Sequence, residues 1–216
     1  MKRIFCTFGL LAFITLLNAQ IKVACIGNSI TYGSGIEGRD SLSYPAQLQK
    51  MMGKQWDIEN FGVSGATLLK KGNKPYWKET AFTAALSFRP EIVIIKLGTN
   101  DSKPFNWQYK NEYPVDYKAL IDTFHNLETV KKIFICMPVP VVEDRWGISK
   151  TVTENEIVPM VKKIGEANNV EVIDLYTPFA GKDYLLPDKI HPNASGAALM
   201  ASILHEYLNK YLDSKK

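Results

Sequence analysis

Five apolar runs of strand length recur along this chain, and a segment long enough for a helix separates each run from the next. The runs are IKVACIG (21–27), WDIENFG (56–62), EIVIIKLG (91–98), KKIFICMP (131–138) and VEVIDLY (170–176). The third and fourth are almost continuously apolar, as expected of strands covered on both faces. This alternation predicts one α/β domain with a parallel sheet, and right-handed crossovers make it a doubly wound three-layer α/β/α sandwich.

The segments between the runs carry helix signals. SLSYPAQLQKMMG (41–53) has a proline near its start and a glycine at its end, the usual asymmetry of a helix. Residues 76–88, 115–129 and 153–168 can each present one apolar face, and Asn193 can cap a last helix that reaches about Leu212. Two loops, 101–114 and 138–152, are longer than a compact domain needs, which is typical of functional loops.

The first residues, MKRIFCTFGLLAFITLLNA, combine a basic start with an apolar stretch and a small residue, Ala19. This pattern predicts a secretory signal peptide over 1–19, followed by a single domain over 20–216. A membrane anchor is the alternative, but the run from Ile4 to Leu17 is shorter than the roughly 20 residues that span a bilayer. We therefore expect a secreted or periplasmic protein with no membrane span after processing. Loss of Lys2 and Arg3 would lower the net charge by two, from +4 to +2, which gives no argument for a nucleic-acid partner.

Polar residues follow several of the predicted strands, at the edge where a parallel sheet binds ligands. Asp188 and His191 are three residues apart in the turn before the last helix, so the carboxylate can orient the imidazole as in a hydrolase triad. Asp174, near the end of the fifth run, is an alternative partner for the histidine. Ser29 follows the first run and can be either a nucleophile or a helix cap.

Two further residues could supply hydrogen-bond donors at the same edge. Gly65 follows the second run and lets a backbone N–H approach a substrate, and Asn100 follows the third and offers an uncharged amide. Either residue alone could belong to an ordinary turn. With Ser29 and the Asp188–His191 pair, however, they provide every group that acyl transfer needs. No His, Cys and Asp cluster has the spacing of metal ligands, and the glycines of GSGIEG (33–38) do not form a dinucleotide fingerprint, so we expect no metal and no other cofactor.

Four blocks in this order resemble the SGNH hydrolases, also called GDSL esterases. They are GNSIT with Ser29, NFGVSGAT with Gly65, GTND with Asn100 and DKIHPN with Asp188 and His191. The resemblance implies a flavodoxin-like five-stranded sheet in the order 2-1-3-4-5 and metal-independent ester hydrolysis. It assigns Ser29, Asp188 and His191 to the catalytic triad, and Ser29, Gly65 and Asn100 to the oxyanion hole.

The resemblance has one departure and one corollary. The family usually has Asp before the serine, whereas this chain has Asn28, which keeps an acceptor and loses the charge. In the implied strand order the strands of Cys25 and Cys136 are not neighbours, so we expect two free buried thiols rather than a disulfide.

Aromatic residues crowd the expected rim of the site, and exposed rings beside polar groups suit the faces of sugars. Those proposed to contact substrate are Trp77, Phe105, Trp107 and Trp146, although such rings could equally pack the loops onto the domain. The chain is expected to be a secreted serine esterase that removes short acyl groups, chiefly O-acetyl, from carbohydrates such as xylan or sialic acid through an acyl-serine intermediate. The alternatives are a lysophospholipase or thioesterase with a longer acyl pocket, and a glycan-binding protein on an inactive scaffold.

Overall fold

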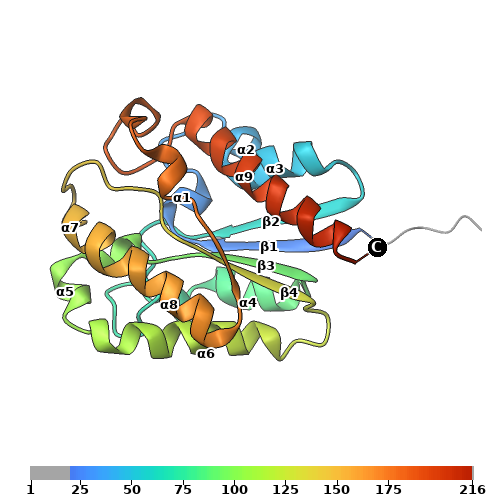
Figure 1. The fold of residues 1–216 in the computed structure, drawn as a ribbon, viewed down its shortest axis with the longest axis horizontal. Helices are drawn as coiled ribbons and strands as arrows, with labels where there is room; N and C mark the ends of the chain where they lie inside the picture. The colour runs from blue at the N-terminus through green and yellow to red at the C-terminus, as the bar shows by residue number, and fades with distance from the viewer. Residues whose placement is uncertain (1–19, 216) are drawn as a thin grey trace, which may run out of the picture.

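The computed structural model describes residues 20–215 and contains one five-stranded sheet in that range (Figure 1). Its strands are β1 (Ile21–Gly27), β2 (Trp56–Gly62), β3 (Ile92–Lys96), β4 (Lys132–Cys136) and β5 (Glu171–Ile173). Every neighbouring pair is parallel, and the order across the sheet is β2-β1-β3-β4-β5. The predicted sheet and its strand order are thus confirmed. The predicted signal peptide lies outside the described residues.

Helices cover both faces of the sheet, which gives the predicted three layers. Figure 1 shows α1 (Ser29–Tyr32), α2 (Arg39–Leu42), α3 (Tyr44–Met52) and α9 (Ala194–Asp213) on one side. On the other side lie α4 (Thr80–Ser87), α5 (Pro104–Trp107), α6 (Tyr113–His125), α7 (Lys150–Val152) and α8 (Val158–Asn168). Alternate strand residues supply the two cores: Val23 and Cys25 face α3 and α9, whereas Ala24 and Ile26 face α4, α6 and α8.

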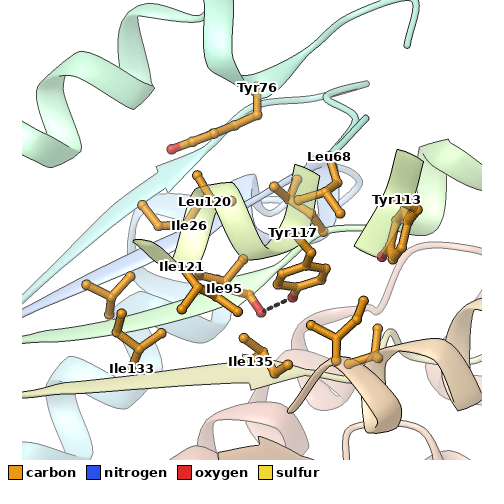
Figure 2. Close-up of a cluster of buried hydrophobic side chains, with 14 of the residues drawn as sticks. Ile26, Leu68, Tyr76, Ile95, Tyr113, Tyr117, Leu120, Ile121, Ile133 and Ile135 are labelled. Atoms are coloured by element: carbon orange, nitrogen blue, oxygen red, sulfur yellow. Dashed lines mark hydrogen bonds between the residues drawn. The ribbon is translucent and has the colours of Figure 1, made fainter. Parts of the chain in front are cut away.

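The core beneath α6 shows how the second layer is fixed. Figure 2 shows Tyr117, Leu120 and Ile121 of α6 packed over the isoleucines of β3 and β4. The Tyr117 hydroxyl donates to the Ile95 carbonyl at 3.3 Å, so the buried phenol is satisfied as well as packed. This apolar layer gives a rigid support for the segments that leave the ends of the strands.

Three predicted elements differ from those observed. Residues 41–53 form α2 and α3 rather than one helix, because Ser43 adopts an extended conformation between them. Strand β5 ends at Ile173 instead of residue 176, because Asp174 Oδ1 accepts the Tyr176 and Thr177 N–H groups and turns the chain. The predicted loop 101–114 is a series of short helical turns, including a 3₁₀ turn at Thr99–Ser102, α5 and a 3₁₀ turn at Lys110–Glu112.

Cys25 and Cys136 are free and buried, as predicted. They lie on β1 and β4, and β3 separates these strands in the sheet. Burial raises the pKa of the Cys25 thiol to about 12, and it also raises the pKa of Cys136. Both residues therefore act as small apolar side chains in the core.

Candidate active site

Ser29 is placed by the sharp turn from β1 into α1. Asn28 caps this helix, since its Oδ1 accepts the Ile30 N–H at 3.1 Å. Gly27 and Gly62 let β1, β2 and α1 meet closely, because a Cβ on Gly27 would collide with the Thr31 side chain and one on Gly62 with the Tyr32 backbone. Ser29 is thereby fixed at the carboxyl end of β1 with 8% of its surface exposed.

Ser29, His191 and Asp188 form a continuous hydrogen-bonded chain. His191 Nε2 lies 2.8 Å from Ser29 Oγ, and His191 Nδ1 lies 2.8 Å from Asp188 Oδ2. An ionised carboxylate only accepts hydrogen bonds, so Nδ1 carries the proton and Nε2 is left to accept the Ser29 hydroxyl. The structure thus brings Ser29 next to the Asp188–His191 pair, although Ser29 and His191 are 162 residues apart in the sequence.

The local fold keeps Asp188 ionised. Its burial opposes the charge, but the backbone N–H groups of His191 and Ile190 both donate to Oδ1, at 2.6 and 2.9 Å. These bonds and the imidazole outweigh burial and hold the pKa of Asp188 below its usual range. Asp174, the alternative partner, is occupied by the turn after β5, as described above.

Asn100 and the glycine segment meet at the same edge. Asn100 is 3% exposed, and its Nδ2 donates to the Ala66 carbonyl at 3.1 Å. Gly65 precedes that carbonyl and has φ of 82°, a conformation that favours glycine. The two predicted donors therefore come from adjoining segments, one after β2 and the other after β3.

Asp101 fastens the glycine segment, a role that the sequence did not reveal. Its two carboxylate oxygens accept the N–H groups of Leu68 at 3.0 Å and Leu69 at 2.8 Å. The side chain is fully buried, and this burial outweighs the hydrogen bonds and raises its pKa to about 7. The signal was present in the GTND block, where a charged residue directly follows the candidate donor.

Lys96 is the second residue that the sequence analysis missed. It ends β3 with no exposed surface, and its Nζ lies 3.5 Å from Asn28 Oδ1. The single lysine within the apolar run EIVIIKLG was the available signal, but a lysine near a strand end ordinarily reaches solvent.

Of the four aromatic residues proposed to contact substrate, Trp146 is the one whose ring contacts the triad. Its ring centroid lies 5.6 Å from that of His191 at an interplanar angle of 42°. The side chain is 55% exposed, and the Arg145 guanidinium lies 4.6 Å from the ring centroid. Trp146 therefore presents an exposed aromatic surface beside His191, the predicted catalytic base.

The other three rings are arranged differently. Phe105 is 51% exposed on α5, after the Asn100 block. Trp107 is buried against Tyr113, with its Nε1 donating to Glu156 at 3.0 Å. Trp77 is half-buried, and its Nε1 donates to the Leu68 carbonyl at 2.9 Å. Trp77 and Trp107 thus pack the segments after β2 and β3 onto the domain.

Within residues 20–215, no group of three or more His, Cys, Asp or Glu side chains is placed to hold a metal ion. In the same range no helix has the length and apolar character needed to cross a membrane.

Comparison with known proteins identifies the family to which this arrangement belongs. A model of the GDSL-like Lipase/Acylhydrolase family matches residues 25–199, which include every block described above. The chain belongs to the GDSL-like lipase/acylhydrolase family. The resemblance noted in the sequence is thereby confirmed.

Two curated relatives are esterases of greater length. An acetylxylan esterase of Xylanibacter ruminicola is 41% identical over 202 residues, covering 85% of this chain and 42% of the relative. A multidomain esterase of Ruminococcus flavefaciens is 24% identical over 228 residues, covering 89% of this chain and 29% of the relative. The chain therefore spans less than half the length of these relatives.

Solved structures share the fold. An acetyl xylan esterase superposes with a TM-score of 0.70 at 21% identity, covering 87% of this chain and 99% of that structure. A carbohydrate acetylesterase family member from Sinorhizobium meliloti gives a TM-score of 0.70 at 18% identity, covering 89% and 99%. At these identities the similarity supports the three-layer architecture of this chain.

Proposed function

We propose that this acylhydrolase is a serine esterase that removes short acyl groups, chiefly O-acetyl groups, from carbohydrates. The observation that carries the proposal is the Ser29–His191–Asp188 chain, with 2.8 Å between His191 Nε2 and Ser29 Oγ. This spacing lets the imidazole take the serine proton as attack begins.

The geometry supports a two-step reaction. His191 accepts the Ser29 proton while Oγ attacks the ester carbonyl, and Asp188 stabilises the resulting imidazolium. The backbone N–H groups of Ser29 and Gly65 and the Asn100 amide then stabilise the oxyanion. Asn100 Nδ2 has two hydrogens and gives one to Ala66, so the second is left for the substrate. Collapse expels the sugar hydroxyl with the proton from His191, and water activated by the same base releases acetate from Ser29.

Carbohydrate is favoured as the alcohol part of the ester. Trp146 offers an exposed ring next to His191, where the leaving alcohol departs, and aromatic faces bind the apolar faces of sugars. The 41% identical relative is named an acetylxylan esterase, which supports acetylated xylan as the first substrate to test. Residues 1–19 carry the export pattern, so we place the substrate outside the cytoplasm.

The test is release of acetate from acetylated xylan and from acetylated oligosaccharides. Wild-type protein should release acetate, whereas Ser29→Ala and His191→Ala should each lose at least about a thousandfold in kcat. Asn100→Ala should lose about 10²–10³ in kcat if the amide contacts the oxyanion.

Two controls distinguish the alternatives. A series of acetate, butyrate and octanoate p-nitrophenyl esters should show a steep decline after acetate, and a preference for octanoate would instead indicate a lysophospholipase or thioesterase. A fluorophosphonate probe should label Ser29 in the folded protein. Absence of labelling together with binding of xylan would indicate a glycan-binding protein.

A further inference from the structure

A buried lysine contacts the residues that precede both the proposed nucleophile and the proposed oxyanion amide. Lys96 lies opposite Gly27 in the register of β3 and β1. Its Nζ is 3.5 Å from Asn28 Oδ1 and 3.3 Å from Thr99 Oγ1. Because Asn28 adjoins Ser29 and Thr99 adjoins Asn100, one amino group connects the two strand ends that form the site.

This lysine has no counter-ion among residues 20–215. Its only hydrogen-bond acceptors there are an amide oxygen and a hydroxyl, and it is fully buried. Burial of an unpaired ammonium destabilises a fold, so packing does not explain why a lysine stands here.

The surroundings of Lys96 are rich in donors and poor in acceptors. The Asn28 amide is held in one orientation, because its Oδ1 accepts the Ile30 N–H at 3.1 Å. Asn28 Nδ2 is consequently left buried without a partner. Lys96 Nζ and Asn28 Nδ2 together create positive potential at Asn28, the residue that precedes the proposed nucleophile Ser29.

We propose that Lys96 is a positioning residue for ester hydrolysis, which holds Asn28 and Thr99 in place and whose positive charge stabilises the oxyanion formed between Ser29 and Asn100. This inference rests on the proposed esterase function. It predicts that the protonated lysine supports faster acylation than the neutral amine.

The charge of Lys96 changes in an accessible range of pH. Burial lowers its pKa from 10.5 to about 7. The titratable group that interacts with Lys96 is Cys136 on β4, which belongs to one buried cluster with Cys25 on β1 and Tyr44 on α3. Burial raises the pKa of all three, so they stay neutral there. The rate should therefore fall as Lys96 loses its proton, which gives a decline on the alkaline side of the pH profile.

The experiment is the pH profile of p-nitrophenyl acetate hydrolysis for wild-type protein and two variants. Lys96→Met should lower kcat about ten- to a hundredfold, leave KM unchanged and remove the alkaline decline. Asn28→Asp should move the decline to higher pH, because a carboxylate beside Lys96 keeps it protonated. Lys132→Met is the matched control. Lys132 begins β4 and pairs with Glu171 at 2.8 Å, so its replacement should retain the wild-type pH profile.

Each outcome decides the inference. A folded Lys96→Met protein with the wild-type pH profile and kcat would overturn the proposal. An Asn28→Asp protein whose rate declines at the same pH as wild type would also overturn it. If Lys96→Met does not fold, Asn28→Asp decides alone. Fluorophosphonate labelling of wild-type Ser29 is measured in parallel, because loss of that reaction would overturn the esterase function itself rather than the role of Lys96.

Discussion

Trp146 is held in an unusual backbone conformation beside His191, the proposed catalytic base. Its φ is 51°, in the left-handed region that bulky residues rarely adopt. The neighbouring residues tie this loop down, since the Arg145 and Ile148 backbones bond to each other and Ser149 N–H donates to Ser102 Oγ at 3.0 Å. The loop thus fixes an exposed indole beside His191, where the proposed function places the sugar of the substrate.

Trp146→Ala is therefore expected to weaken catalysis on polysaccharide more than on a small ester. Loss of one stacking contact should reduce kcat/KM for acetylated xylan about five- to tenfold, because such contacts are worth about 1 kcal/mol. Hydrolysis of p-nitrophenyl acetate should change by less than about twofold. Trp146→Phe keeps a flat ring and should recover most of the polysaccharide activity. An equal loss on both substrates would mean that the indole supports His191 rather than the sugar.

At the scale of elements, the segment after β3 positions the segment after β2. Asp101 accepts two backbone N–H groups from residues 68–69, and Asp116 of α6 accepts the Lys70 N–H at 2.8 Å. Asn106 of α5 accepts the Asn73 N–H at 2.9 Å. These bonds fix residues 68–73, and with them the approach of Gly65 to the site.

Asp101→Asn and Asp116→Asn form a matched pair for testing this attachment. Asp101 accepts one backbone N–H through each carboxylate oxygen. Asparagine has one oxygen, so its NH₂ group would face one of the two buried N–H groups, which would lose its acceptor. We expect a loss of about 1–3 kcal/mol in the free energy of unfolding and a decrease in kcat. Asp116 accepts one N–H through Oδ2, and its Oδ1 lies 3.7 Å from the ammonium of Lys70, which is partly exposed. Asparagine can keep the hydrogen bond and loses only this ion pair, so that variant should lose less than about 1 kcal/mol. Urea unfolding and p-nitrophenyl acetate kinetics measure both effects. Equal changes in unfolding free energy and in kcat for the two variants would show that Asp101 does not hold residues 68–69 in place.

The elements also explain which parts of the site were predictable. Ser29 and Asn100 follow strand ends closely, so strand recognition was enough to predict one shared edge for them. The Asp188–His191 pair lies far beyond β5, and its spacing and the family resemblance were needed to assign it to the same site. The exposure of Trp77 and Trp107 depends on how the segments after β2 and β3 pack, which periodicity does not report. The early end of β5 depends on the bonds of Asp174 to the following backbone, and that local competition is invisible in the apolar pattern of VEVIDLY.

Two buried ionisable groups change the free energy of unfolding of the whole domain in opposite directions as the pH rises. Lys96 has its pKa lowered to about 7, so its contribution to stability is fully present above 10.5 and is lost as pH falls through about 7. Asp101 has its pKa raised from 3.8 to about 7, so its contribution is present below 3.8 and is lost as pH rises through about 7. The wild-type curve alone therefore does not isolate either group.

The difference between wild-type protein and Lys96→Met isolates the lysine. Methionine fills a similar volume without a charge, so the variant should be more stable than wild type, and the gain should be largest below about pH 7, where the folded lysine is charged. Between about pH 7 and about pH 9 the gain should shrink by at most about 1.4 kcal/mol per unit, because the folded wild type then holds a neutral amine while its unfolded chain still binds the proton. Urea unfolding of both proteins at about pH 6 and about pH 9 measures this change, and Lys132→Met provides the reference for loss of a partly exposed lysine. A stability difference that is the same at both pH values would mean that Lys96 titrates near its ordinary range. We expect the same variant to be more stable and to hydrolyse the ester more slowly. The two results together would show that the charge of Lys96 destabilises the fold and accelerates the reaction.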